Sequence, residues 1–368
     1  MNRIRPHDDA SLRARLAEPQ GPVRVVIDTD AANEIDDQFA LAWALLSPAQ
    51  LRIEGIYAAP FSFAHRRAEM QRARAARKAP ESADAGGREL LRRYAAQLDH
   101  FERRGWEPGR VDLPVFNPPG EGMERSWREI HEVFARLGLE PGDRVRRGST
   151  RYLSRIDQPV DSDAAQHLIA AARSGPADEP LYVAAIGCVT NVASALLMAP
   201  DIAERIVVVW TSGYPSHAPH TNDSFNLEQD LLASRHLFDC GVALVYLPGF
   251  HVGAQLRLSL AEMEKHVRGR GAIGDYLYRL YTNNPLWDFL GMESENAYSW
   301  VIWDLIDFAW LMNPQWVPSE IVATPRLGDD RRWQAEKGRP PMREAYGVAR
   351  DAIFGDFFAK LARASGAE

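Results

Sequence analysis

The sequence predicts an α/β fold in which a mainly parallel central sheet is flanked by helices. Short runs of apolar, often β-branched residues alternate with segments whose apolar residues recur roughly every three or four positions. This alternation is typical of parallel strands joined by crossover helices. The segments are spread over all 368 residues, which favours one large domain over two smaller ones.

The first strand is expected after a polar arm. Residues 1–22 are polar and end in Pro-Gln-Gly-Pro, which predicts a loosely held arm ahead of a single domain at 23–368. The apolar β-branched run at 25–27 predicts a buried strand, and the apolar pattern at 35–46 predicts a helix directly after it. The alternating segment 51–60 predicts a second strand.

An Arg-rich region around residues 64–142 is expected to form helices inserted into the domain. Helical patterns cover 64–79 and 88–110, and both segments contain many arginines. A basic helix can bind nucleic acid, but this one lacks interleaved aromatic residues, so a solvated face or a subunit contact is favoured. A further helix is predicted over 127–137.

Strands and helices alternate through the rest of the chain. Strands are expected at 181–187, 206–210 and 243–248, and helices at 164–173 and 276–281. The aromatic-rich segment 299–314 is predicted to be one buried helix with Asp304 in its middle. A closing strand and a surface helix are expected beyond residue 325.

Composition and charge exclude several classes of function. With 46% hydrophobic residues and a formal net charge of -7, the chain lacks the positive balance typical of proteins that bind nucleic acid. It has no run of eighteen apolar residues and no secretory signal, so we expect no membrane contact and a cytoplasmic location. Cys188 and Cys240 lie in apolar surroundings and are expected to be buried thiols.

Acidic side chains are concentrated where the first predicted strand ends. Five acids lie within ten residues: Asp28, Asp30, Glu34, Asp36 and Asp37. They repel one another unless a cation lies between them, and Ca²⁺ collects roughly six to eight such oxygens. Alternatively, one acid caps the helix and the others form a solvated first turn. Capping needs only one acid, so a metal site is favoured. The spacing excludes an EF-hand.

This acidic segment resembles the N-terminal signature of the inosine-uridine preferring nucleoside hydrolases. In that family an Asp-x-Asp precedes a short turn and an Asp-Asp pair at the start of a helix. Asp28-Thr29-Asp30 and Asp36-Asp37 carry the match, although the turn of five residues is longer than the family's Pro-Gly plus one residue. The resemblance implies a divergent member with a single domain and a Rossmann-like central sheet.

Three later segments extend the resemblance. Residues 187–193 are similar to the family's Gly-Pro-Leu-Thr-Asn-Ile-Ala segment. Residues 225–226 match the end of its Glu-Phe-Asn element, with Ser224 in place of the Glu. Asp304 resembles the acid of its carboxy-terminal helix, with Trp303 where a His is common. These segments all lie at predicted strand ends or in a buried helix, where ligands bind in open α/β sheets.

The resemblance implies a calcium site and a ribose site. It assigns Ca²⁺ to the carboxylates of Asp30, Asp37 and Asp304 and to the carbonyl oxygen of Thr190. Asp30 would also take the proton of the attacking water, and Asp36 would hold the ribose 2′-hydroxyl. Independently of the family, an acid inside a buried aromatic helix needs a partner charge, which favours metal binding by Asp304.

Other candidate site residues have plainer alternatives. The candidates for substrate binding are Asp36, Ser62, Asn222, Asn226 and Trp303. His251, at the end of a predicted strand, is the candidate proton donor for the leaving base. The alternatives are an Asx-rich turn for Asn222 and Asn226, a helix cap for Thr190 and a structural role for His251.

The function implied by the resemblance is Ca²⁺-dependent hydrolysis of the N-glycosidic bond of purine or pyrimidine ribonucleosides. The partner is then a small-molecule nucleoside, and a homodimer or homotetramer is the expected assembly. A second hypothesis is a Ca²⁺-dependent ribose- or nucleoside-binding protein with altered catalysis, because Ser62, Ser224 and Trp303 depart from the family. A third, a haloacid-dehalogenase-like phosphatase, is disfavoured because Ala31-Ala32 replaces the expected Gly-Thr.

Overall fold

The structure, a computed structural model, describes residues 9–106, 116–176, 178–284, 286–290, 292 and 298–366. At its centre lies an eight-stranded sheet in the order β3-β2-β1-β4-β5-β6-β12-β9. Its strands are β1 (Val23–Thr29), β2 (Leu51–Ala58), β3 (Val145–Arg147), β4 (Leu181–Ala185), β5 (Ile206–Ser212), β6 (Ala243–Pro248), β9 (Ser319–Ala323) and β12 (Pro341–Ala345). Neighbouring strands are parallel except β12 and β9, which confirms the predicted mainly parallel sheet.

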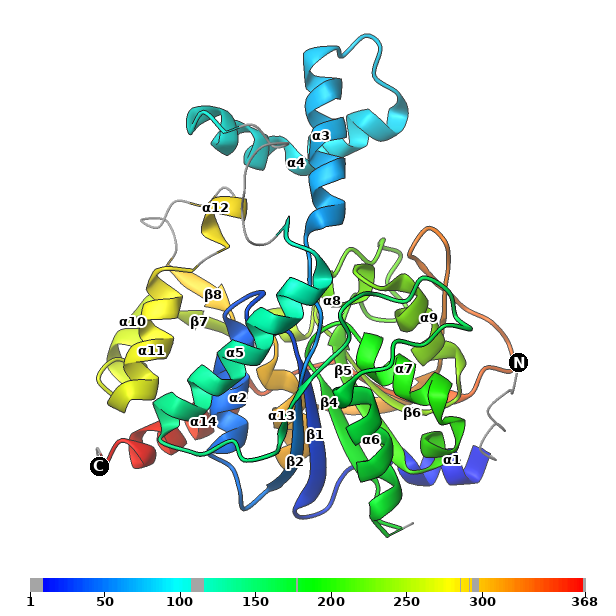
Figure 1. Cartoon of the computed structure of the whole chain (residues 1–368), viewed down its shortest axis with the longest axis vertical. Helices are drawn as coiled ribbons and strands as arrows, with labels where there is room; N and C mark the ends of the chain where they lie inside the picture. The colour runs from blue at the N-terminus through cyan, green and yellow to red at the C-terminus, as the bar shows by residue number, and fades with distance from the viewer. Residues whose placement is uncertain are drawn as a thin grey trace.

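The central strands β1, β4, β5 and β6 are buried along their whole length. A strand that is covered on both faces is an almost continuous apolar run, and this is the pattern that made these strands predictable. Helices α2 (Asp36–Leu45), α5 (Pro119–Leu137), α11 (Gly271–Thr282), α13 (Leu305–Met312) and α14 (Arg350–Ala364) pack against one face. Helices α6 (Asp163–Ser174), α7 (Thr190–Met198) and α9 (Leu231–Asp239) pack against the other (Figure 1).

Short elements connect these layers. They are the helices α8 (Phe225–Glu228), α10 (Leu260–Glu262) and α12 (Trp287–Leu290) and the strands β7 (Arg257–Ser259), β8 (Ser299–Val301), β10 (Arg326–Leu327) and β11 (Trp333–Gln334). The pairs β7–β8 and β10–β11 form two small antiparallel sheets. None of the described helices is long and apolar enough to cross a membrane.

The strand order puts a topological switch point between β1 and β4. From β1 the chain continues to β2 and β3 on one side, and it later returns to β4 on the other side of β1. Asp28 of β1 pairs in register with Ala185 of β4, so the residues that follow them leave the sheet side by side. In open α/β sheets, ligands bind outside the carboxyl ends of the strands at such a point.

The described part of the N-terminal segment, from residue 9 onward, differs from the loosely held arm expected there. Residues in this region form α1 (Asp9–Arg15), and the side chains of Leu12 and Leu16 are buried in the core. Arg343 of β12 donates a hydrogen bond to the carbonyl oxygen of Leu16 at 2.6 Å. Two apolar residues in a polar, Arg-rich stretch are too weak a periodic signal to predict a packed helix.

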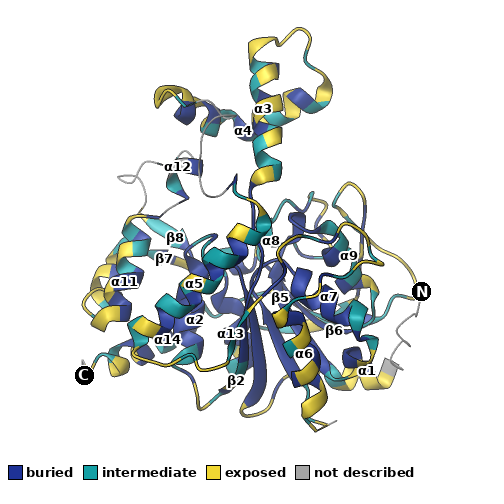
Figure 2. Cartoon of the chain, in the orientation of Figure 1, coloured by how far each residue is buried: buried dark blue, intermediate teal, exposed yellow. Residues whose placement is uncertain are grey.

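The Arg-rich region contains two helices, α3 (Ala64–Lys78) and α4 (Ala85–Arg103), that project from the body of the molecule (Figure 1). Their facing sides form a separate small apolar cluster, in which Met70 of α3 packs with Tyr94 and Leu98 of α4 and Phe289 of α12. Their outer sides are exposed (Figure 2). Residues 107–110, at the end of the predicted helix 88–110, lie outside the described residues.

The single helix predicted over 299–314 is wrong in its first part. Residues 299–301 form β8, which pairs antiparallel with β7, and the helix α13 begins only after Asp304. Asp304 is therefore the N-cap residue of α13 and not an acid in the middle of a helix. The apolar aromatic residues of this segment suit a strand as well as a helix, which is why periodicity alone misassigned it.

Candidate active site

A cavity of about 320 Å³ lies at the carboxyl ends of the central strands. It receives Asp30 from the end of β1, Ile186 from the end of β4, Ser212 from the end of β5 and Gly249 from the loop after β6. Asp36 and Asp37 enter the cavity from the first turn of α2. The cavity therefore occupies the place where the strand order predicts a ligand.

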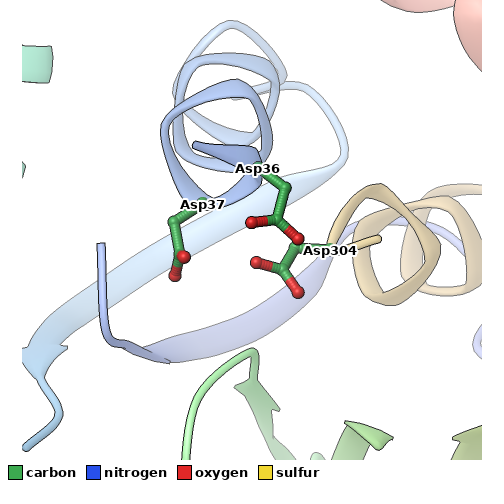
Figure 3. Close-up of side chains that lie close together, drawn as sticks. All are labelled: Asp36, Asp37 and Asp304. Atoms are coloured by element: carbon green, nitrogen blue, oxygen red, sulfur yellow. The ribbon is translucent and has the colours of Figure 1, made fainter. Parts of the chain in front are cut away.

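Three carboxylates meet at one end of this cavity and form the acidic cluster: Asp36, Asp37 and Asp304. One carboxylate oxygen from each lies within 4.8 Å of the others, and Figure 3 shows the three side chains turned toward one another from the starts of α2 and α13. All three residues are buried. Segments far apart in the sequence thus supply one group of carboxylates. The sequence analysis expected Asp37 and Asp304 to share a metal ion with Asp30 and Thr190, and it assigned Asp36 to the ribose 2′-hydroxyl.

Burial makes ionised carboxylates costly at this site. It raises the pKa of Asp36 to about 7, although backbone hydrogen bonds and a hydrogen bond with Asp304 lower it. Burial and then the charge of Asp36 raise the pKa of Asp304 and of Asp30 well above the usual value. For Asp37, burial acts together with the charges of Asp30 and Asp36. These groups need protons or a cation to neutralise them.

The donor set fits a hard divalent cation. Every candidate ligand in the acidic cluster is an oxygen atom, and its members lie close enough together to share one ion. The hydroxyl of Thr29 donates to Asp37 Oδ1 at 2.5 Å and so fixes the orientation of that carboxylate. Asp30 is held more loosely, because Asn33 and Gln229 donate to its Oδ2 at 3.4 and 3.5 Å.

The longer turn between Asp30 and Asp36 still brings both carboxylates to the cavity. The backbone N–H of Asn33 donates to the carbonyl oxygen of Asp30 at 2.7 Å, which closes the first part of the turn. Ala31 and Ile35 are completely buried, so the turn is packed against the core. The two additional residues are therefore accommodated without moving either acid out of the site.

Sequence comparison identifies the family to which these features belong. The family model of the inosine-uridine preferring nucleoside hydrolases matches residues 25–353. The chain belongs to this family. It is 25% identical over 299 residues to the non-specific ribonucleoside hydrolase RihC of Salmonella paratyphi A, and the match covers 80% of each chain. Nucleoside hydrolases are metal-dependent, and the acidic cluster can hold a metal ion.

Solved structures share the nucleoside hydrolase fold. The purine-preferring ribonucleoside hydrolase from Gardnerella vaginalis aligns with a TM-score of 0.59 and 18% identity, covering 93% of this chain and 99% of that one. The type III effector protein XopQ, solved in complex with adenosine diphosphate ribose, aligns with a TM-score of 0.54 and 17% identity, covering 97% and 98%. The single-domain fold predicted from the sequence is confirmed.

Asn226 and Trp303, like Asp36, are predicted substrate ligands that line the cavity. The Nδ2 of Asn226 donates to the carbonyl oxygens of Ile186 at 3.1 Å and Thr211 at 3.2 Å, which holds this side chain across the ends of β4 and β5. Trp303 lies beside the acidic cluster and contacts the ring of Phe250 edge to face, with ring centroids 5.9 Å apart. Both residues are therefore in reach of a bound ligand.

Thr190 is not among the residues that line the cavity. It begins α7, and its hydroxyl donates to Asp230 Oδ2 at 2.7 Å. Carbonyl groups of a helix point toward its C-terminus, so the carbonyl of a first-turn residue points along α7 and away from the strand ends. Ile186, four residues earlier, is the residue of this segment that lines the cavity.

Ser62 and Asn222 also lie outside the cavity lining and serve local structure. The Ser62 hydroxyl donates to the carbonyl of Asn117 at 2.7 Å and accepts from the backbone N–H of Ala64 at 3.0 Å. Asn222 accepts from the backbone N–H of Tyr214 at 2.7 Å and donates to the carbonyl of Arg331 at 2.9 Å. Their side chains are thus already engaged by the backbone.

His251 is exposed and does not line the cavity, although its neighbour Phe250 does. Its φ of 71° is unusual for a residue other than glycine. Its ring packs near Tyr214 and His220, with centroids 5.2 and 5.7 Å away. The structure therefore places this side chain in a surface group of rings next to the site.

The sequence analysis missed the residues that α3 and α4 contribute. Arg66 of α3 and Arg93, Tyr94 and Gln97 of α4 all line the cavity. Nothing in their local pattern distinguishes them from the other arginines of a solvated helix face. Their role depends on how the two helices pack relative to the strand ends, which no spacing along the sequence encodes.

Proposed function

We propose that this chain catalyses Ca²⁺-dependent hydrolysis of the N-glycosidic bond of purine or pyrimidine ribonucleosides, releasing ribose and the free base. The main support is the acidic cluster, which gathers buried carboxylates from α2 and from the start of α13 in the same cavity as Asp30. Buried acids without a cationic partner destabilise a fold, so their presence together indicates a functional ion.

The proposed calcium ligands are the carboxylates of Asp30, Asp37 and Asp304. For the backbone ligand we favour the carbonyl of Ile186 over that of Thr190, because Ile186 lines the cavity and Thr190 does not. Ca²⁺ accepts irregular arrangements of oxygen ligands more readily than Mg²⁺, which suits donors from three separate segments. When bound, the ion would hold the ribose diol and lower the pKa of a water.

Asp30 is the proposed general base, and Asp36 the proposed ligand of the 2′-hydroxyl. Asp30 takes the proton of the water whose oxygen attacks the anomeric carbon, while the C1′–N bond breaks and its electron pair leaves with the base. Positive charge develops on the sugar ring in an oxocarbenium-like transition state. The surrounding carboxylates stabilise that charge, so they favour the transition state over the neutral substrate.

The leaving base is proposed to stack on Trp303, with Asn226 holding a ribose hydroxyl. His251 was the first candidate to protonate the base, but its exposed position outside the cavity argues against direct contact. We therefore propose that the base takes its proton from water. Assembly as a homodimer or homotetramer and a cytoplasmic location stay predictions.

Binding of a ribose-bearing ligand without turnover is the second candidate function. It is favoured by the described cavity lining, which includes no histidine that could protonate a base. XopQ, which is similar in fold, was solved in complex with adenosine diphosphate ribose, a ribose-bearing compound. A protein of this kind would bind nucleosides and release no product.

A panel of ribonucleosides tests the two functions together. With Ca²⁺ present, we expect reducing sugar to be released from inosine, uridine or both, at a rate that rises with enzyme concentration. Calorimetry on the same panel measures binding independently of turnover. Binding without release would support the second candidate, and neither binding nor release across the panel would contradict both.

A further inference from the structure

Two arginines line the same cavity as the acidic cluster. Arg66 and Arg93 line it together with the hydrogen-bonding side chains of Tyr94 and Gln97. We propose that these two arginines bind a phosphate group of the substrate, so that the chain prefers phosphorylated ribosyl compounds such as nucleoside 5′-monophosphates. This inference rests on the proposed function, because the acidic cluster must hold the ribose.

The shape of the sugar relates the two arginines to the acidic cluster. The 2′- and 3′-hydroxyls lie on one edge of the ribose ring, and the C5′ carbon lies on the opposite side of the ring. A ribose whose diol faces the acidic cluster therefore directs a 5′-substituent away from the acids and toward the other walls of the cavity. Arg66 and Arg93, on α3 and α4, belong to those other walls.

Glu228 of α8 anchors the arginines without using all their donors. Its side chain is 2% exposed and forms ion pairs with Arg66 at 2.5 Å, Arg331 at 2.7 Å and Arg93 at 3.5 Å. Although burial raises its pKa, a hydrogen bond with His65 and the nearby arginine charges lower it to about 2. Each guanidinium carries five N–H donors, more than one carboxylate can accept from three arginines.

Arg93 is the less tightly held of the two cavity arginines. Its contacts with described acids are 3.4 Å to Glu69, 3.5 Å to Glu228 and 3.9 Å to Asp223. Charge-assisted N–H···O bonds are normally about 2.7–2.9 Å long. A phosphate in the cavity would offer Arg93 closer acceptor oxygens than any of these carboxylates does.

Arg66 is held in place by aromatic rings. Its guanidinium lies over the rings of Phe63 and Phe225, 5.3 and 5.5 Å from their centroids, and these rings stack on each other at 4.0 Å. Cation–π contacts of this kind fix a guanidinium while leaving N–H donors at its edge for other partners. The site is therefore arranged before a ligand arrives, which favours tight binding.

Asp223 and Glu69 partly balance the arginine charges, so the preference depends on direct hydrogen bonds more than on net charge. Asp223 also lines the cavity, and its side chain is 41% exposed. An unphosphorylated nucleoside has no phosphate oxygens to offer the arginine donors. A site built to hydrogen-bond a substrate group discriminates against the analogue that lacks it.

The experiment compares uridine and inosine with their 5′-monophosphates in the presence of Ca²⁺. Release of the base gives kcat/KM, and calorimetry gives Kd for all four compounds. We expect the phosphorylated compounds to be preferred by about tenfold or more, the value of one charge-assisted hydrogen bond. Arg93→Gln should remove this preference, and Arg66→Gln should reduce it.

Arg72→Gln is the matched control, because Arg72 lies on α3, pairs with the exposed Asp84 and does not line the cavity. It should keep the full preference. Equal kcat/KM and Kd with and without phosphate would overturn the inference, and so would a preference that survives both Arg93→Gln and Arg66→Gln. If nucleosides are hydrolysed and the 5′-phosphate improves neither kcat/KM nor Kd, this inference is rejected and the proposed function stands. If no compound binds or reacts, the proposed function fails with it.

Discussion

Replacement of Asp304 by Asn is expected to lower kcat/KM for ribonucleoside hydrolysis by about a thousandfold or more. The side chain is one of three that meet in the acidic cluster, and its loss removes a charged ligand whose contribution to transition-state stabilisation is several kcal/mol. The same change removes a like charge beside Asp36 and Asp37, whose repulsion raises the pKa of Asp304 after burial does.

The fold should therefore not suffer from this substitution. Without added metal, the Tm of Asp304→Asn should equal or exceed that of the parent protein, and Ca²⁺ should no longer raise it. Loss of activity together with unchanged or increased stability is the signature of a residue kept for function. A variant that loses activity because it unfolds would contradict the prediction.

Asp307→Asn is the matched control for this experiment. Asp307 lies one turn further along α13, is completely buried and does not line the cavity. Neither of its carboxylate oxygens has a hydrogen-bond partner among the described residues, and burial raises its pKa well above the usual value. Its replacement should leave hydrolysis and the effect of Ca²⁺ close to those of the parent. Equal losses of hydrolysis in Asp304→Asn and Asp307→Asn would contradict a special role for Asp304.

Metal removal is expected to have the second large effect, and its size should depend on pH. Treatment with EDTA at pH 8 should lower hydrolysis by about a thousandfold, and Ca²⁺ should restore it. Burial raises the pKa of the proposed ligands Asp30, Asp37 and Asp304 well above the usual value, and a carboxylate must lose its proton before it binds a cation. The Tm increase caused by Ca²⁺ should therefore be larger at pH 8 than at pH 5.

The metal-free protein should show the opposite trend in stability. Because the pKa of Asp36 is raised from 3.8 to about 7 in the folded state, the folded chain binds more protons than the unfolded chain between these values. Its free energy of unfolding then falls as pH rises from about 4 to about 7. Thermal melts in EDTA across this pH range test the sign of the change in stability. A metal-free stability that rises steadily with pH would contradict it.

Local patterns predicted the part of the site that lies on one segment. Asp30, Asp36 and Asp37 follow a buried strand and begin a helix, so the topology of an α/β sheet places them at its ligand-binding edge. Asp304 was placed beside them only through resemblance to the family. Contacts between segments far apart in the sequence leave no periodic signal that reasoning about one segment can detect.

The differences between the site predicted from the sequence and the site in the structure have the same physical origin. The family motif around Thr190 does not by itself show which backbone carbonyl faces the cavity, and Ile186 rather than Thr190 lines the cavity. The positions of Arg66 and Arg93 follow from the packing of α3 against α4 over a separate apolar cluster. A helix face exposed to solvent and a helix face that lines a cavity have the same sequence pattern. Only the packing of the inserted helices decides which of their residues reach the cavity.

A crystal structure with Ca²⁺ and ribose tests the central claim most directly. The account predicts one ion at about 2.3–2.6 Å from oxygens of Asp30, Asp37 and Asp304, with the sugar diol completing its shell. An ion bound elsewhere, or a sugar held away from these carboxylates, would contradict it.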